Sequence, residues 1–157
     1  MTMALIVYNE AKYFLSTKQL NLRDDVLKAM LVTQGYIPDP NQKFVDDGTI
    51  ISPNQFEVAG TGYVGGFGGS GRKLISNKSV IRDTETFRIR LFGDNVSWSP
   101  LAVGIVGGIL VIREGTTSSD SDSNALLIGY TNEGGFPIPT DGGELQIRWN
   151  INGILAF

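Results

Sequence analysis

The sequence contains no cysteine and no histidine among its 157 residues. Without cysteine there is no disulfide, no thiolate nucleophile and no cysteine-ligated zinc, which excludes the framework of a small disulfide-rich secreted domain. Without histidine the chain lacks the commonest general base and metal ligand. Any catalysis would therefore depend on carboxylates, lysine, tyrosine or hydroxyl groups.

An excess of positive charge and a long hydrophobic run are also missing. The chain has 13 Lys and Arg against 16 Asp and Glu, a net charge of −3. Nucleic-acid binding depends on cationic contacts to phosphate, so no nucleic-acid partner is expected. The apolar stretch from Leu101 to Ile112 is shorter than the roughly 20 residues of a membrane-spanning helix. The apolar start, Met1 to Val7, lacks the basic region of a signal peptide. We therefore expect no membrane partner, and a protein that is either made and kept in a reducing cytoplasm or exported by a route that needs no signal.

Glycine, in contrast, is abundant, with 20 residues, while 41% of the chain is hydrophobic and 18% is charged. This composition is typical of a folded protein rich in turns and strands. A chain of this length can bury a core without covalent cross-links, so residues 1–157 are expected to form a single β-rich domain.

The stretch from Leu101 to Ile112 is expected to form the centre of that core. Its Val and Ile side chains favour a strand buried on both faces. Each of its three glycines would cost a helix about 1 kcal/mol relative to alanine. We therefore predict two short strands interrupted near Gly107 and Gly108.

The rest of the pattern predicts one short helix and several further strands. The helix begins with Asn9 as its cap and ends near Lys18. Residues 25–33 favour a strand, with a helix as the alternative, and residues 38–55 read as a long surface loop. Further strands are expected over residues 56–59, 80–92, 125–130 and 144–150. In the second of these, Phe87, Ile89 and Leu91 share one face and Arg88 and Arg90 the other; in the last, Leu145, Ile147 and Trp149 face inward. The predicted fold is mainly β: an antiparallel β-sandwich or jelly-roll-like barrel of seven or eight strands with one short N-terminal helix.

Three motifs resemble ligand or catalytic sites without meeting their requirements. Gly60, Gly62 and Gly65 match G-x-G-x-x-G, but no helix follows to hold a pyrophosphate. A special-geometry loop displaying Tyr63 and Phe67 is the better interpretation. Asp120, Asp122 and Asn124 have the first spacing of a calcium loop, which then fails at Ala125 and Thr131. The neighbouring carboxylates Asp24–Asp25 and Asp46–Asp47 are typical of solvated turns. We predict no catalytic residue, no metal and no cofactor, and hence no enzyme.

Six of the 13 basic residues are concentrated between residues 72 and 90: Arg72, Lys73, Lys78, Arg82, Arg88 and Arg90. They either form a solvated strand face or a patch that docks on an acidic partner.

Several segments together resemble a type of small virion protein of tailed bacteriophages. They are Met3-Ala-Leu-Ile, residues 26–39, Phe44-Val-Asp46, residues 57–63, Asn95-Val-Ser-Trp-Ser99 and residues 142–149 with the hydrophobic tail. The glycine run from Gly65 to Gly71 and the polar segment from Ser118 to Asn124 depart from that pattern. The resemblance implies a non-enzymatic structural protein, a capsid decoration (cement) protein. Such proteins bind the major capsid protein on the outside of the capsid and commonly form homotrimers, and they are made in the host bacterial cytoplasm.

A contact role requires exposed aromatic or basic side chains, because aromatic residues dominate the energy of buried interfaces. The candidate partner-interface residues are Tyr8, Phe14, Tyr36, Phe67, Arg72, Lys73, Lys78 and Phe136. The alternative function is a tail-located receptor- or carbohydrate-binding module, in which Trp98, Trp149 or the tyrosines would serve as sugar platforms.

Overall fold

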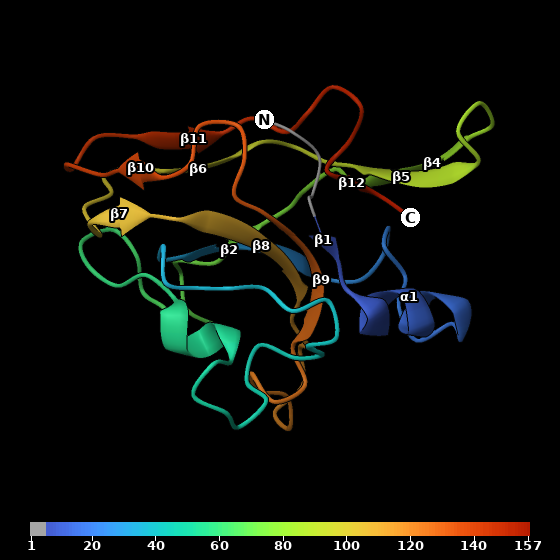
Figure 1. Ribbon diagram of the computed structural model, residues 1–157, viewed down its shortest axis with the longest axis horizontal. Coiled ribbons are helices and arrows are strands. Elements are labelled where there is room, and N and C mark those ends of the chain that lie inside the picture. Colours follow the sequence, from blue (N-terminus) through green and yellow to red (C-terminus); the bar gives the residue numbers. More distant parts are fainter. Residues whose placement is uncertain (1–5) are drawn as a thin grey trace.

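The largest sheet has five antiparallel strands in the order β1-β9-β8-β2-β3 (Figure 1). The computed structural model describes residues 6–157, so the first five residues of the apolar N-terminus, which the resemblance includes in part, lie outside the described residues. The strands are β1 (Ile6–Val7), β9 (Leu126–Thr131), β8 (Gly108–Arg113), β2 (Leu27–Val32) and β3 (Lys73–Leu74). The strand predicted over residues 25–33 is confirmed, and its helical alternative is wrong.

The central strand of this sheet, β8, lies in the apolar stretch that we expected to form the core. It pairs with β2 on one side and with β9 on the other, and its residues from Gly108 to Ile112 are buried. A separate short strand, β7 (Ile105–Val106), precedes it, so the predicted interruption near Gly107 is confirmed. A Cβ atom at Gly107 would lie 2.4 Å from the backbone nitrogen of Gln34. The two segments can approach so closely there because glycine has no side chain.

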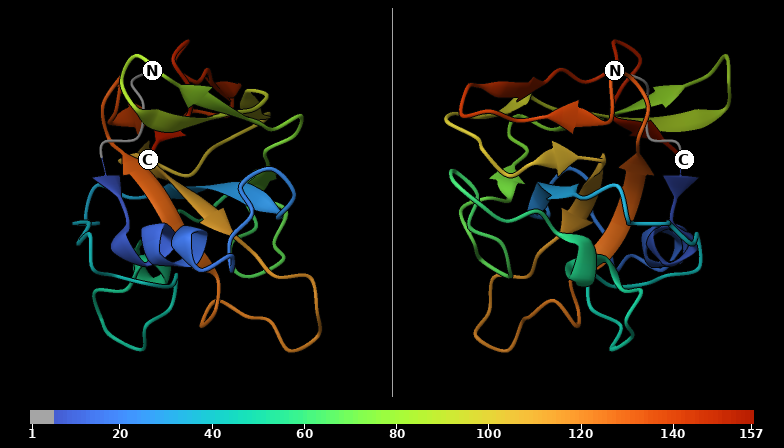
Figure 2. Two further views of the ribbon diagram at one scale, coloured as in Figure 1. Left: turned by 90° about the vertical axis from the view of Figure 1, so that its right-hand side faces the viewer. Right: turned by 60° about the vertical axis from the view of Figure 1, so that its left-hand side comes forward.

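Three smaller antiparallel sheets form a second layer above the large sheet (Figures 1 and 2). They pair β10 (Ile138–Pro139) with β7, β11 (Leu145–Ile147) with β6 (Val96–Trp98), and β12 (Leu155–Ala156) with β5 (Arg88–Phe92) and then β4 (Ser79–Asp83). The fold is therefore mainly β with a sandwich-like arrangement, as predicted.

The two faces of the large sheet contribute to two separate hydrophobic clusters. Ile109 and Val111 of β8 face the cluster between the layers, which also contains Trp98, Leu145 and Ile147. Their neighbours Leu110 and Ile112 point the other way, into a cluster closed by Tyr8, Tyr36 and Val45. This division follows from the alternation of side chains along a strand. The predicted inward positions of Leu145 and Ile147 are confirmed, and Trp149 is half-buried.

The helix α1 (Asn9–Ser16) lies against β9, with Ala11 buried in the contact. Tyr8, not Asn9, occupies the capping position, and Asn9 donates instead to the side chain of Asn41 at 2.7 Å. The helix ends at Ser16, two residues before the predicted end, and Lys18 has φ +62°. A single turn of 3₁₀ helix, η1 (Pro53–Phe56), ends at the first residue of the segment predicted as a strand edge, residues 56–59. In that segment only Glu57 pairs, through one isolated bridge to Val32, so the predicted strand is wrong.

Residues 79–92 fold back as the hairpin β4–β5, which corrects the expectation of one continuous strand. The turn is fixed by the carboxylate of Asp83, which accepts hydrogen bonds from the backbone N–H groups of Glu85 and Thr86 and from the Thr86 hydroxyl. Such Asx-type turns compete with extended structure. Phe87 leaves the turn with φ +58° and is 91% exposed, whereas Leu91 is buried, so the face predicted for Phe87, Ile89 and Leu91 does not extend to Phe87.

Candidate interaction surface

Tyr8 and Tyr36, two of the predicted contact residues, lie in the core. Their hydroxyl oxygens are 2.7 Å apart, and Tyr36 donates to Oε1 of Gln42 at 2.8 Å. Burial raises the pKa of Tyr8 well above its usual value and raises the pKa of Tyr36 to about 12. The mutual hydrogen bond allows both phenol rings to enter the core without an unsatisfied hydroxyl. A partner cannot reach either residue from the surface, so both are removed from the contact set.

Arg72, the first residue of the predicted basic patch, is buried among three carboxylates. Its guanidinium nitrogens lie 2.5 Å from Glu57, 2.7 Å from Glu114 and 2.6 Å from Asp122. Burial alone would lower the pKa of Arg72, but its bonds to Asp122 and Glu57 hold it above the usual value. A partner cannot reach this side chain, so the patch prediction is wrong for Arg72.

The same network holds the glycine-rich loop against the large sheet. Glu57 accepts from the backbone N–H of Gly66 at 3.2 Å, and Glu114 accepts from that of Gly68 at 3.4 Å. Lys28 of β2 joins through Glu114 at 2.5 Å. Three carboxylates and two cations thus form one network with a formal charge of −1, and the arrangement is structural in role.

The glycine-rich loop has the special backbone geometry that the sequence predicts. Cβ atoms at Gly60 and Gly62 would lie 2.4 Å from the carbonyl oxygen of Ala102 and 1.8 Å from that of Pro100. The loop does not display Tyr63, however. That side chain is buried, accepts from the backbone N–H of Leu31 at 3.2 Å and donates to Glu57 at 3.1 Å.

The other basic residues of the predicted patch divide between several environments. Lys73 is half-buried in β3, and Lys78 donates to the backbone carbonyl of Asp25. Burial lowers the pKa of Lys78. Arg90 lies 2.6 Å from Asp83 across the hairpin. Only the hairpin residues Arg82 and Arg88 are exposed among the six, so the sequence cluster does not form one surface patch.

The three predicted phenylalanines are half-buried. Phe14 packs edge-on against Phe44, with ring centroids 6.4 Å apart, and the guanidinium carbon of Arg113 lies 5.6 Å from its ring. Phe136 packs against the cluster between the layers, and Phe67 lies in the glycine-rich loop. These side chains still offer partial surface to a partner.

The residues that could hold calcium or a sugar are largely occupied by internal contacts. Asp122 is paired with Arg72, and Asp120 accepts from Thr117 and Asn124. Among residues 6–157 no group of three Asp, Glu, His or Cys side chains is placed to hold a metal ion. Trp98 is buried with Nε1 donating to Gly71 at 2.6 Å, so it is not a sugar platform.

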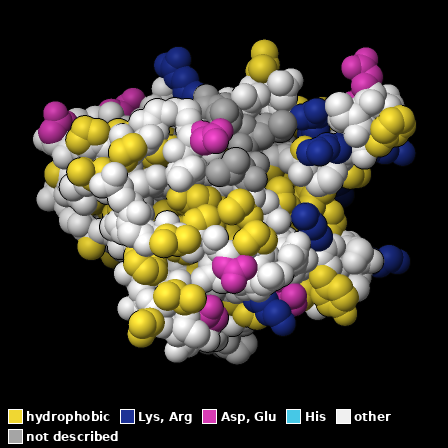
Figure 3. Space-filling view, in the orientation of Figure 1, with side chains coloured by type: hydrophobic (Ala, Val, Ile, Leu, Met, Phe, Trp, Pro, Cys, Tyr) yellow, Lys and Arg dark blue, Asp and Glu magenta, His cyan; other side chains and the backbone are white. Residues whose placement is uncertain are grey.

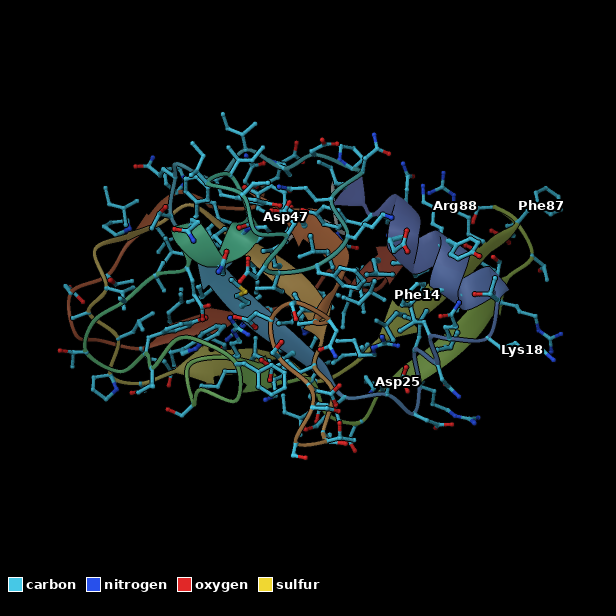
Figure 4. All side chains as sticks on the ribbon, turned by 90° about the horizontal axis from the view of Figure 1, so that it is seen from below. Phe14, Lys18, Asp25, Asp47, Phe87 and Arg88 are labelled. Carbon is cyan, nitrogen blue, oxygen red and sulfur yellow. The ribbon has the colours of Figure 1, made fainter. Side chains whose placement is uncertain are left out.

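Sequence patterns failed to identify the large apolar side chains that are most exposed. Most occur in loops and in the hairpin, and the others lie in α1, β3 and β7: Tyr13, Ile37, Ile50, Ile51, Val64, Leu74, Val80, Ile81, Phe87, Ile105 and Ile151. Hydrophobic side chains are visible over much of the face in Figure 3. In Figure 4, Phe87 lies at the outer end of the hairpin, on the side of the molecule that also carries Phe14 of α1 and Lys18. The turn residues Asp83 to Thr86 were the sequence feature that could have predicted this projection.

Two surface hollows accompany these side chains. One, of about 710 Å³, is lined by loop residues that include Asp39, Asp46, Asp47 and Ile51. The other, of about 570 Å³, is more apolar and lies at the base of the hairpin, where Leu15, Leu20, Leu22, Val80 and Ile89 line it.

Within residues 6–157, no helix combines the length and apolar character needed to cross a membrane. Comparison of the chain with protein-family models, with curated proteins and with solved structures found no match.

Proposed function

We propose that this chain is a non-enzymatic structural protein of a bacteriophage particle, a capsid decoration (cement) protein. It binds the major capsid protein on the outside of the shell, stabilises the shell and associates with itself as a trimer. The resemblance in sequence supports this role, and the distribution of exposed apolar side chains supports a function in protein contact.

The observation that carries the proposal is the pair Ile50 and Ile51 in the loop between β2 and η1. Ile50 is 89% exposed and Ile51 is 59% exposed, although the neighbouring Val45 is fully buried and fixes the loop to the core. Isolated exposed apolar residues are ordinary, but adjacent ones on an anchored loop are typical of contact sites. The loop therefore offers an apolar surface on a rigid base, which a cement protein requires.

Re-binding of the purified protein to capsids that lack it tests the proposal. We expect saturable binding and increased resistance of the capsids to heat or to low ionic strength. Replacement of Ile50 and Ile51 by serine should weaken binding at least tenfold. The matched control is Ile151→Ser, which removes an equally exposed isoleucine from the turn before β12.

Absence of saturable binding to shells would refute the decoration role. Binding to tails instead would favour the receptor- or carbohydrate-binding alternative. Equal binding by the loop variant and the Ile151 control would refute the assignment of the contact to Ile50 and Ile51.

A further inference from the structure

The strand β4 forms one edge of the sheet β12-β5-β4, and no other described strand pairs with its outer side. Hydrogen bonds show which of its backbone groups face outward. Ile89 of β5 exchanges two bonds with Phe157, of 3.1 and 2.9 Å, so its peptide groups point toward the β12 side. The backbone N–H and C=O groups of Arg90, the next residue, therefore point toward β4, where Arg90 pairs with Ile81. It follows that the N–H and C=O groups of Val80 and Arg82 face the open edge.

This edge lacks two of the devices that protect exposed strands, proline and a β-bulge. β4 contains no proline, and its register with β5 runs without a bulge from Ser79 to Asp83. Val80 is 38% exposed and Ile81 is 51% exposed. Edge strands of this kind are templates for pairing with another strand.

We propose that β4 pairs with β4 of a second copy of this chain, antiparallel about a two-fold axis at Ile81. In this register Val80 lies opposite Arg82 of the other copy, and the two exchange both backbone hydrogen bonds. Ser79 lies opposite Asp83, and the two Ile81 side chains meet on the axis. A two-fold contact of this kind uses the same surface on both copies and closes on itself.

The charges of the strand select this register and this partner. The residues of β4 whose backbone groups face outward are even-numbered, so each must lie opposite an even-numbered residue of the other copy. Only three registers near the middle of the strand meet this condition. A shift in one direction places Arg82 opposite Arg82, and a shift in the other places Lys78 opposite Arg82. Like charges directly opposite are unfavourable in a sheet. The register centred on Ile81 is the one without such a pair, so the strand is complementary to itself.

The contact is small, since it consists of one strand pair. Interfaces below about 1,200 Å² are typical of weak, transient complexes. It becomes effective where copies are held close together, because tethering raises the effective concentration. On a particle it would link neighbouring trimers across two-fold positions. The inference goes beyond the proposed function and does not depend on capsid binding.

Disulfide trapping tests the pairing in the free, full-length protein, since the chain has no native cysteine. Opposed residues that are not hydrogen-bonded to each other have Cα atoms about 4.5 Å apart, which is within disulfide range. Ile81→Cys should therefore give a covalent dimer under mild oxidation. Ser79→Cys is the control, because its two copies would lie four residues apart along the strands, about 14 Å. We expect cross-linking at least tenfold faster at position 81, and equal rates would overturn the proposal.

A proline substitution tests the backbone contact separately. Val80→Pro removes an N–H group that faces outward and makes no bond within β4–β5, and proline is tolerated on such an edge. In the Ile81→Cys background it should slow cross-linking at least tenfold while the thermal unfolding midpoint stays within a few degrees. Unchanged cross-linking in a folded Val80→Pro protein would overturn the pairing. Because no capsids are present, neither result bears on the decoration role.

Discussion

A guanidinium nitrogen of Arg72 lies 2.7 Å from a carboxylate oxygen of Glu114, and both side chains are almost entirely buried. Arg72 directly follows the glycine-rich loop, and Glu114 directly follows β8. A buried cation with its carboxylates contributes little net stability when complete, but removal of one partner leaves uncompensated charge. The following predictions start from this pair.

Replacement of Arg72 by alanine should lower the free energy of unfolding by about 3–5 kcal/mol, because three carboxylates would lose their cation. Denaturant unfolding followed by circular dichroism measures the change. The matched control is Arg82→Ala, an exposed arginine of β4, which should alter stability by less than about 0.5 kcal/mol. A loss at Arg72 no larger than that of the control would contradict the structural role of the network.

Acid should weaken the protein through Glu114. Burial alone would raise the pKa of this carboxyl, but hydrogen bonds from Lys28 and Arg72 lower it overall. The unfolded chain therefore binds the proton first, and the stabilisation is present above the unfolded pKa of about 4.3 and is lost as the pH falls through the lower folded pKa. Unfolding free energies measured from pH 7 to pH 3 should fall more steeply for the native protein than for Glu114→Gln. Parallel slopes would contradict the assignment.

Alkali should weaken the protein through the buried tyrosines. Tyr36 has a folded pKa of about 12, against about 10 in an unfolded chain, and burial also raises the pKa of Tyr8. Between these two values the unfolded chain holds fewer protons, so stability present below pH 10 falls as the pH rises toward 12. In a pH titration, absorbance at the phenolate band should show that these tyrosines ionise only above about pH 10, at the pH where the protein unfolds. Complete ionisation near pH 10 in the folded protein would show that the rings are accessible.

The hydroxyl pair itself can be tested by removing either oxygen. Tyr36 donates to Gln42, so Tyr8 must donate to Tyr36. Tyr36→Phe leaves the Tyr8 hydroxyl without an acceptor and should cost about 1–3 kcal/mol, whereas Tyr8→Phe should cost about 1 kcal/mol. The double variant should cost less than the sum of the single ones, because the residues share a bond. The reverse order of the two single effects would contradict this direction of donation.

Two glycines of one loop separate backbone strain from close packing. Gly66 has φ +84° with open space around it, so Gly66→Ala should cost about 1–2 kcal/mol. Gly62 has φ +85°, and its Cβ would also meet the carbonyl oxygen of Pro100 at 1.8 Å. Gly62→Ala should therefore exceed the cost of Gly66→Ala by about 1–3 kcal/mol in thermal or denaturant unfolding. Equal costs would mean that the loop is not held against Pro100.

Local patterns predicted the elements that depend on local chemistry. The Val- and Ile-rich run with Gly107 predicted the position of β8 and its break, and the alternation of Leu145 and Ile147 predicted β11. The interior ion pairs were not predictable in this way. Arg72 is 42 residues from Glu114 and 50 from Asp122, so its neutralisation depends on the arrangement of distant segments. The hairpin was missed because the alternation of Phe87, Ile89 and Leu91 was taken to continue a strand from residue 80, although Asp83 imposes a turn between the two halves.

Asp122 belongs to an exposed serine-rich loop, yet its carboxylate reaches the buried guanidinium of Arg72. The loop is therefore anchored to the interior of the protein through Asp122. A protease cut or an insertion immediately beside Asp122 would break its contact with Arg72 and loosen the glycine-rich loop on the other side of Arg72. Substitution of the serines further from Asp122 would have little effect on the rest of the molecule.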